Sequence, residues 1–385
     1  MNDIIFQKQQ GGLDRPLAGE DHISALLFYS TIKPTAWASH ALLQVTSIEH
    51  AVELGITKRS VNSGLMYYHI AEFFRINPGA TLYVGIYTPI GTPNFAEIKA
   101  IQRATEGKIR QIGVFLTQTF AGSQVTLIQG ILDDLDDEHM PLEALLAADF
   151  SAVTDLTALV DLRTLDCPKV SVILGQDGGN EGRELFTSTT KSVTCLGAAL
   201  GAVSKAKVNE NIGWVQKFKM NEVELDVPAL ANGILISVSD PILVNSINTK
   251  GYIFLRKHVG KSGSYFNDSP TCVEIISDYA FIENNRTMDK AIRGIRTYLL
   301  PQLNGPLMVD PTSGKLDLGT VRYLEDLANE PLVQMARDGE LSGYKASIDP
   351  AQNVLSTSEL VINVVNVPVG VARIIKVKIG FGLKV

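Results

Sequence analysis

Apolar residues in the first half of the chain form short continuous runs, separated by longer segments with helical spacing. The runs at 81–87, 112–116 and 169–174 are almost entirely apolar. A run of this kind is typical of a strand that is buried on both faces. The segments before and between them, such as 65–76 and 122–137, have the length and spacing of helices. Alternation of helix and buried strand predicts an α/β layer with a largely parallel sheet.

Three further segments of this half are predicted to be helical. Thr46 and Glu49 have the spacing of a capping box, with Thr46 as the cap and Gly55 as the stop. A helix is also expected over 154–165. The segment 191–207 is rich in glycine and alanine, which favours close packing against a neighbouring element.

The C-terminal part has a different order of elements and predicts an α+β domain. Strands are expected at 233–239 and 251–259. A long helix is expected over 287–300, because four apolar residues recur on one of its faces. These residues are Met288, Ile292, Ile295 and Leu299. Another helix begins near Thr320 and is expected to break or kink at Pro331.

The end of the chain, "VARIIKVKIGF", alternates with a period of two, which predicts a strand. One face carries Val371, Arg373, Ile375, Val377, Ile379 and Phe381. An open strand edge promotes uncontrolled pairing, so this ribbon needs a neighbour. It is either an internal strand of the second domain or, as we expect for the last strand, it pairs with another subunit.

These patterns divide the chain into four parts. They are an N-terminal arm at 1–20, an α/β domain at 21–232, an α+β domain at 233–370 and a C-terminal strand or arm at 371–385. The first part is polar and contains several glycines and a proline, which is typical of an arm or linker.

The composition agrees with a folded chain of two or three domains. Of 385 residues, 45% are hydrophobic and 19% are charged. The formal net charge of −7 predicts no general attraction to nucleic acid. Three widely spaced cysteines suit a reducing cytosol. No segment has the pattern of a signal peptide or membrane-spanning helix, so we expect cytoplasmic synthesis and no direct membrane insertion.

The glycine-rich stretch "GQDGGNEG" at 175–182 follows a predicted buried strand, where α/β folds hold phosphates. It matches neither the dinucleotide-binding pattern nor the P-loop. A surface loop is therefore favoured, and a nucleotide- or phosphate-binding enzyme is kept as the alternative function. The acidic run at 133–138 lacks the spacing of a calcium loop, and the six histidines form no metal-ligand pair. We predict no catalytic residue, metal or cofactor.

One charged feature remains. Lys290, Arg293 and Arg296, with Arg286 just before them, fall on one side of the helix at 287–300. The stripe is either a solvated surface or a contact for an acidic protein partner. Phosphate contacts are less favoured, because no aromatic residues are interleaved.

The chain resembles contractile tail sheath proteins of bacteriophages, R-type pyocins and related injection systems. Over 250–385 the resemblance is carried by "YIFLRKHV", "DYAFIENNRTMDKAIRGIRTYLLPQLNGPL", "GELSGYKASIDPAQN" and "STSELVINVVNVPVGVARIIKVKIGF", in that order. In the first half, "GGLDRPLAGEDHISALLFY", "YYHIAEFFRINPGATLYVGIY" and "VSVILGQDGG" resemble a phage-derived sheath-like family formerly of unknown function.

The resemblance implies a structural subunit without enzymatic activity. Such subunits polymerise as stacked hexameric rings around a tail tube and contract to drive the tube through a target envelope. The implied partners are further copies of the chain, the tube protein, and baseplate and tail terminator proteins. The implied final location is a virion tail or injection particle. A non-contractile tail tube or baseplate component is the remaining alternative.

The resemblance also implies roles for individual segments. The C-terminal strand, Val371 to Phe381, corresponds to the arm that pairs with a neighbouring subunit, and 2–12 corresponds by position to an N-terminal arm. The sheath domain that contacts the tube includes the basic stripe, so Lys290, Arg293 and Arg296 are the expected tube contacts. The helix around Arg322 and Glu325 is the competing surface.

Overall fold

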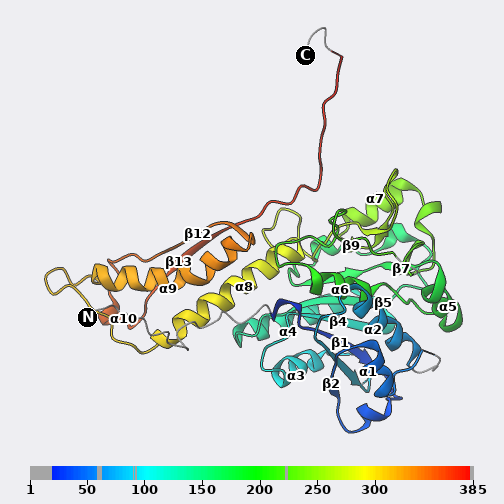
Figure 1. The fold of residues 1–385 in the computed structure, drawn as a ribbon, viewed down its shortest axis with the longest axis horizontal. Helices are drawn as coiled ribbons and strands as arrows, with labels where there is room; N and C mark the ends of the chain where they lie inside the picture. The colour runs from blue at the N-terminus through cyan, green and yellow to red at the C-terminus, as the bar shows by residue number, and fades with distance from the viewer. Residues whose placement is uncertain (1–19, 59–62, 90, 92, 222–223, 382–385) are drawn as a thin grey trace, which may run out of the picture.

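The computed structural model describes residues 20–58, 63–89, 91, 93–221 and 224–381. The predicted N-terminal arm at 2–12 lies outside the described residues. The centre of the larger body is a seven-stranded sheet in the order β2-β3-β1-β4-β5-β6-β9 (Figure 1). Its strands are β1 (Ser24–Tyr29), β2 (Leu42–Val45), β3 (Leu82–Tyr87), β4 (Gln111–Thr119), β5 (Glu143–Asp149), β6 (Val170–Ile173) and β9 (Tyr252–Ile253).

All neighbouring pairs in this sheet are parallel except β2 with β3. The predicted α/β layer with a parallel-rich sheet is therefore confirmed. β9 pairs with β6, so the sheet continues past residue 232, where the sequence pattern placed a boundary. The order also places β1 at the centre, between β3 and β4.

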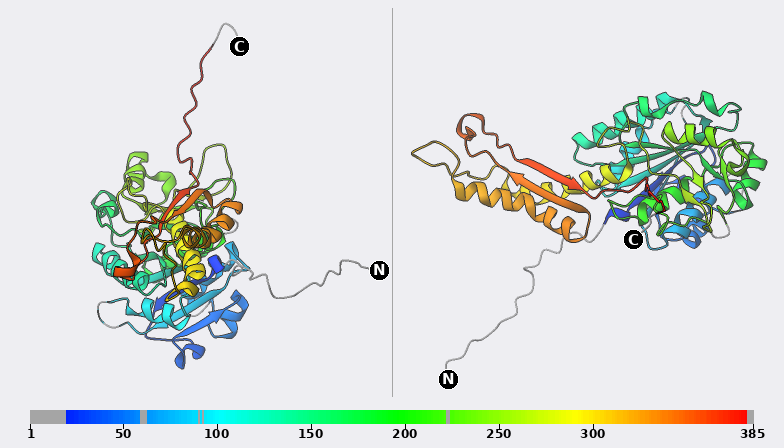
Figure 2. Two further views of the ribbon diagram at one scale, coloured as in Figure 1. Left: turned by 90° about the vertical axis from the view of Figure 1, so that its left-hand side faces the viewer. Right: turned by 90° about the horizontal axis from the view of Figure 1, so that it is seen from above.

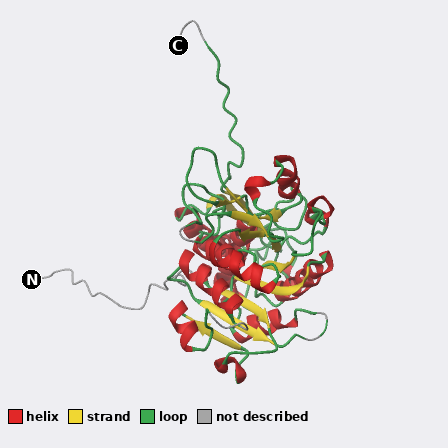
Figure 3. Ribbon diagram, turned by 90° about the vertical axis from the view of Figure 1, so that its right-hand side faces the viewer, coloured by secondary structure: helices red, strands yellow, loops and turns green. Residues whose placement is uncertain are grey.

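Helices cover both faces of the sheet, as the red ribbons in Figure 3 show. They are α1 (Ile48–Glu53), α2 (Gly64–Ile76), α3 (Ala96–Ala104), α4 (Gly122–Asp137), α5 (Asn180–Thr189), α6 (Leu196–Lys205) and α7 (Pro241–Thr249). Alternate side chains of β1 enter two separate cores. Leu26 and Phe28 pack with α2 and α6, while Ala25 and Leu27 pack with α3 and α4.

Close packing of α6 against α2 depends on two glycines. A Cβ atom at Gly197 would clash with the carbonyl oxygen of His69, and one at Gly201 would lie 2.8 Å from that of Phe73. The small-residue helix predicted here is confirmed. Burial lowers the pKa of His69 to about 3, so this imidazole is neutral and belongs to the core.

Several local predictions were wrong in detail. Ser47, not Thr46, caps α1, because its side chain accepts the backbone N–H of His50. The segment expected as strand at 233–239 contains a short 3₁₀ helix, and 154–165 contains two 3₁₀ turns rather than one helix. The 3₁₀ helices are Glu20–His22, Thr35–Ala38, Leu156–Ala158, Leu162–Thr164, Ile236–Val238 and Leu300–Gln302.

Two small strand pairs flank the large sheet. Gly175–Asp177 (β7) pairs with Pro228–Leu230 (β8), and Leu255–Arg256 (β10) pairs with Tyr265–Phe266 (β11). Both pairs are antiparallel, and β10 follows β9 after a single residue. The strand expected at 251–259 is thus divided between two sheets.

A second unit projects from the body, as the right-hand view in Figure 2 shows. It consists of α8 (Ile282–Leu299), α9 (Leu318–Arg337), β12 (Leu341–Ser347), α10 (Val354–Thr357) and β13 (Asn363–Pro368). β12 and β13 form an antiparallel two-stranded sheet that packs on the two long helices. Its inner core is Ala291, Leu332, Met335 and Leu341.

Of the break or kink predicted at Pro331, the break does not occur, because α9 continues through this residue to Arg337, and the kink stays a prediction. Proline removes one backbone hydrogen bond from the helix. Packing compensates for that loss, since the Pro331 ring lies against Gly294 of α8. No helix among the described residues is long and apolar enough to span a membrane.

Candidate interaction site at the root of the C-terminal arm

After β13 the chain leaves the second unit as an extended segment, which Figure 1 shows in red. We call residues 371–381 the C-terminal arm. None of its residues belongs to a strand of this chain. Its large apolar side chains are exposed, with fractions of 79% for Ile375, 96% for Ile379 and 112% for Phe381. The alternating ribbon predicted from the sequence is therefore extended and has no strand partner within the described chain.

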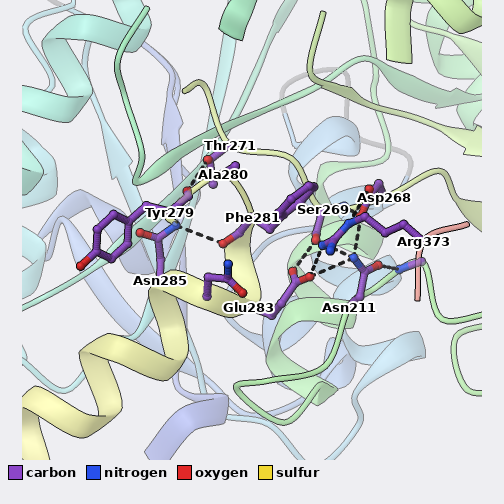
Figure 4. Close-up of polar contacts among 12 residues, drawn as sticks. Asn211, Asp268, Ser269, Thr271, Tyr279, Ala280, Phe281, Glu283, Asn285 and Arg373 are labelled. Carbon is purple, nitrogen blue, oxygen red and sulfur yellow. Dashed lines mark hydrogen bonds and ion pairs between the residues drawn. The ribbon is translucent and has the colours of Figure 1, made fainter. Parts of the chain in front are cut away.

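Arg373 is bound at the root of this arm (Figure 4). Its Nε donates to Asp268 Oδ2 at 2.9 Å, and its Nη2 donates to Glu283. The guanidinium carbon lies 3.3 Å from the centroid of the Phe281 ring. We call these contacts the Arg373 clamp. Through them, the arm is attached to the loop before α8 and to the first turn of that helix.

The carboxylates of the clamp are held by a hydrogen-bond network. Asn211 Nδ2 donates to Asp268 Oδ1 at 2.5 Å and to Glu283 Oε1 at 3.1 Å, and Ser269 Oγ donates to Glu283. Glu283 is 2% exposed. Burial raises the pKa of Glu283, while Arg373 and Ser269 oppose this effect. Arg373 is thus the cation that compensates a buried carboxylate.

Arg163 also contacts the loop that contains Phe281. Its Nη1 donates to the backbone carbonyls of Thr271, Val273 and Ala280 at 3.2 to 3.3 Å. Its guanidinium also lies 5.7 Å from the Phe281 ring centroid. Arg163 therefore supports this loop through contacts that do not involve Arg373. Sequence patterns did not indicate this network, because its members are spread from Arg163 to Arg373.

The basic stripe on α8 is largely engaged within the chain. Lys290 Nζ lies 2.7 Å from both Asp21 Oδ2 and Glu340 Oε1, and Arg293 Nη2 donates to Asp21 Oδ1 at 3.1 Å. Although burial raises the pKa of Asp21, these cations lower it below its ordinary value. Lys290 and Arg293 thus attach the start of the described chain to α8.

Arg296 differs from the other two members of the stripe. It is exposed and borders an apolar groove of about 520 Å³ between α8 and β13. The groove is lined by His139, Met288, Ala291, Ile292, Ile295, Arg296, Leu299, Leu300, Leu303, Val364 and Asn366. The competing surface on α9 contains the exposed Arg322, whereas Glu325 accepts the backbone N–H of Ile348 at 2.8 Å.

The glycine-rich stretch does not form a free surface loop. It comprises β7 and the start of α5, which begins at Asn180. Asp177 Oδ1 accepts the N–H of Gly179 at 3.1 Å, and Glu224 Oε2 accepts that of Glu181 at 3.2 Å. Burial and the neighbouring Asp177 raise the pKa of Glu224 to about 7. Carboxylates thus occupy the N–H groups that a phosphate would need, which opposes phosphate binding.

The acidic run at 133–138 is paired with basic side chains. Lys99 contacts Asp134 at 3.1 Å, Arg103 contacts Glu138 at 2.5 Å, and Lys169 contacts Asp136 at 2.7 Å. Within the described ranges, no group of three or more His, Cys, Asp or Glu side chains could hold a metal ion. These carboxylates connect α4 to α3 and β6.

Comparisons with known proteins agree with this architecture. The family model described as DUF2586, N-terminal domain, matches residues 1–270, and DUF2586, C-terminal domain, matches residues 278–385. A comparison with curated protein sequences finds no match.

Solved structures of similar fold cover nearly the whole chain. The helical sheath of the anti-feeding prophage in the contracted state is 15% identical with a TM-score of 0.64, and covers 98% of each chain. A chain of the 6-fold symmetrised anti-feeding prophage baseplate is 14% identical with a TM-score of 0.63, covering 100% of this chain and 99% of that one.

The PVC sheath of an extracellular contractile injection system, in the contracted state, is 12% identical with a TM-score of 0.62, and covers 100% of this chain and 98% of that one. At these identities the likeness concerns the fold. The chain therefore belongs to the DUF2586 family and has the fold of contractile tail sheath proteins.

Proposed function

We propose that the chain is the structural subunit of a contractile tail sheath. Copies would stack as hexameric rings around a tail tube and contract to drive the tube through a target envelope. The observation that carries the proposal is the C-terminal arm, which leaves the fold with its apolar residues exposed. Such a segment needs a partner, and strand addition to another copy provides one.

The second unit has an open strand edge to which this strand would be added. β13 pairs only with β12 among the described strands, so its other edge is open. That edge borders the groove on α8, where Ile292 is 50% exposed. A strand from another copy, added to β13, would place Ile375, Val377 and Ile379 over the groove. Lys376 and Lys378 would then face solvent.

The tube is the second proposed partner. Lys290, Arg293 and Arg296 form the proposed contact surface for acidic groups of the tube protein. Arg296 would make the direct contact because it is exposed. Lys290 and Arg293 lie on the same stripe and are bound to Asp21. Baseplate and tail terminator proteins are the partners proposed for the ends of the sheath.

Electron microscopy of the purified full-length chain, beside a version that ends at Gly370, tests the proposal. We expect hollow cylinders from the full chain and none from the shortened chain. Cylinders from both would retain the sheath and contradict linkage through residues 371–381. Small uniform particles from both at high concentration would contradict self-assembly. Rings that never change length would favour the tube or baseplate alternative.

A further inference from the structure

The C-terminal arm could pair with its own sheet instead of a neighbour's. β13 ends at Pro368, and a reversal over Val369 and Gly370 would return the arm along the open edge of β13. The arm would then lie over the same groove that we propose as the seat for another copy. A chain closed in this way has no arm to donate.

The strand register determines which residues would lie opposite each other in this closed form. With Val369 and Gly370 in the turn, Ile375 would lie opposite Val364, and Arg373 opposite Asn366. Directly opposite residues of an antiparallel pair share one face. Val364 and Asn366 both line the groove, so Ile375 would fit the apolar surface and Arg373 would enter it.

Arg373 opposes this closure in two ways. Its guanidinium would be placed against Met288 and Ile292, which are apolar, without a carboxylate among the residues that line the groove. It would also leave Asp268 and Glu283, and Glu283 is 2% exposed. A buried carboxylate without its cation is strongly unfavourable.

We propose that the Arg373 clamp prevents the C-terminal arm from closing on its own sheet and so commits it to a neighbouring subunit. Arg373 is thus a positioning residue for strand exchange, and the proposal rests on the sheath function proposed above. The clamp fixes the arm at residue 373, so that residues 374–381 extend away from the body. In this arrangement the groove stays open for the arm of another copy.

Disulfide trapping measures closure directly. Val364→Cys and Ile375→Cys place two thiols opposite each other in the closed form only. The three native cysteines are all buried and do not compete for mild oxidation. In this background we expect a trace of intrachain disulfide, and about tenfold more when Arg373→Gln is added, because the buried carboxylate has then already lost its cation.

Two further variants make the result decisive. Lys376→Gln, on the same arm, should leave the intrachain yield unchanged. Arg373→Gln combined with Glu283→Gln removes the buried charge with its partner, and should raise the yield as Arg373→Gln does. An unchanged yield in both Arg373 variants would overturn the clamp.

Assembly separates this inference from the function on which it rests. Arg373→Gln with the native Val364 and Ile375 should form cylinders only at about tenfold higher protein concentration. Normal assembly of the chain that ends at Gly370 would contradict strand linkage itself, whatever the disulfide yield. Normal assembly of Arg373→Gln, with the shortened chain inactive, would overturn the clamp and leave the sheath function standing.

Discussion

Gly294 of α8 lies directly against Pro331 of α9, and a Cβ atom at position 294 would stand 2.6 Å from the Pro331 Cβ. The two helices approach closely only because one of them lacks a side chain there. This contact supports the unit that carries β12, β13 and the groove.

Gly294→Ala should therefore destabilise the second unit, although alanine is the better helix former. We expect a loss of about 1–3 kcal/mol in the free energy of unfolding, typical of overpacking. Gly130→Ala in α4 is the matched control, because nothing lies within 4 Å of the added Cβ. It should stabilise by up to about 1 kcal/mol. Urea unfolding of both variants decides, and equal stabilisation would contradict the close contact.

The Asp177–Glu224 pair should make stability depend on pH. The pKa of Glu224 is raised from 4.5 to about 7 in the fold, by burial and by Asp177. The folded state therefore binds a proton more tightly than the unfolded state. The stabilisation of the fold by the protonated Glu224 is fully present below about pH 4.5. It is lost as the pH rises through about 7.

Thermal unfolding across this range tests that relationship. Glu224→Gln should flatten the decline in melting temperature between about pH 5 and pH 8. Glu184→Gln, an exposed residue of α5, should retain the wild-type decline. A decline that persists unchanged in Glu224→Gln would assign the effect to another group.

Arg163→Gln should loosen the loop that receives Arg373. The variant loses three hydrogen bonds to backbone carbonyls from a partly buried cation. We expect a loss of about 2–4 kcal/mol in the free energy of unfolding. Arg183→Gln provides the comparison, since the side chain of the exposed Arg183 donates a single hydrogen bond among the described residues, to the Gly233 carbonyl at 3.0 Å. Its loss should be below about 1 kcal/mol. Similar effects of the two variants would refute the supporting role of Arg163.

Arg296→Gln should weaken tube binding without changing the stability of the subunit. Its side chain is exposed, so removal of its charge affects only an external partner. Co-sedimentation of assembled sheath with isolated tube measures the effect, which we expect to be about threefold to tenfold and to decrease with added salt. Lys315→Gln, an exposed cation outside the stripe, is the control. Unchanged tube binding would move the contact to the surface around Arg322.

The elements that the sequence predicted correctly are those with strong local signals. The apolar run at 81–87 predicted β3 (Leu82–Tyr87), and the segment with helical spacing at 122–137 predicted α4. The alternation after residue 370 likewise predicted an extended segment that needs a neighbouring strand. Pro331 does not end its helix, and its ring lies against Gly294 of α8.

Which charged side chains are exposed and which are bound within the chain depends on the tertiary fold. On a helical wheel, Lys290, Arg293 and Arg296 form one basic stripe, yet Asp21 and Glu340 engage the first two from distant parts of the chain. The sequence pattern places Arg373 on one face of a strand. In the fold, its side chain forms ion pairs with Asp268 and Glu283. Periodicity is set by neighbours in sequence, whereas the partner of a charge is set by neighbours in space.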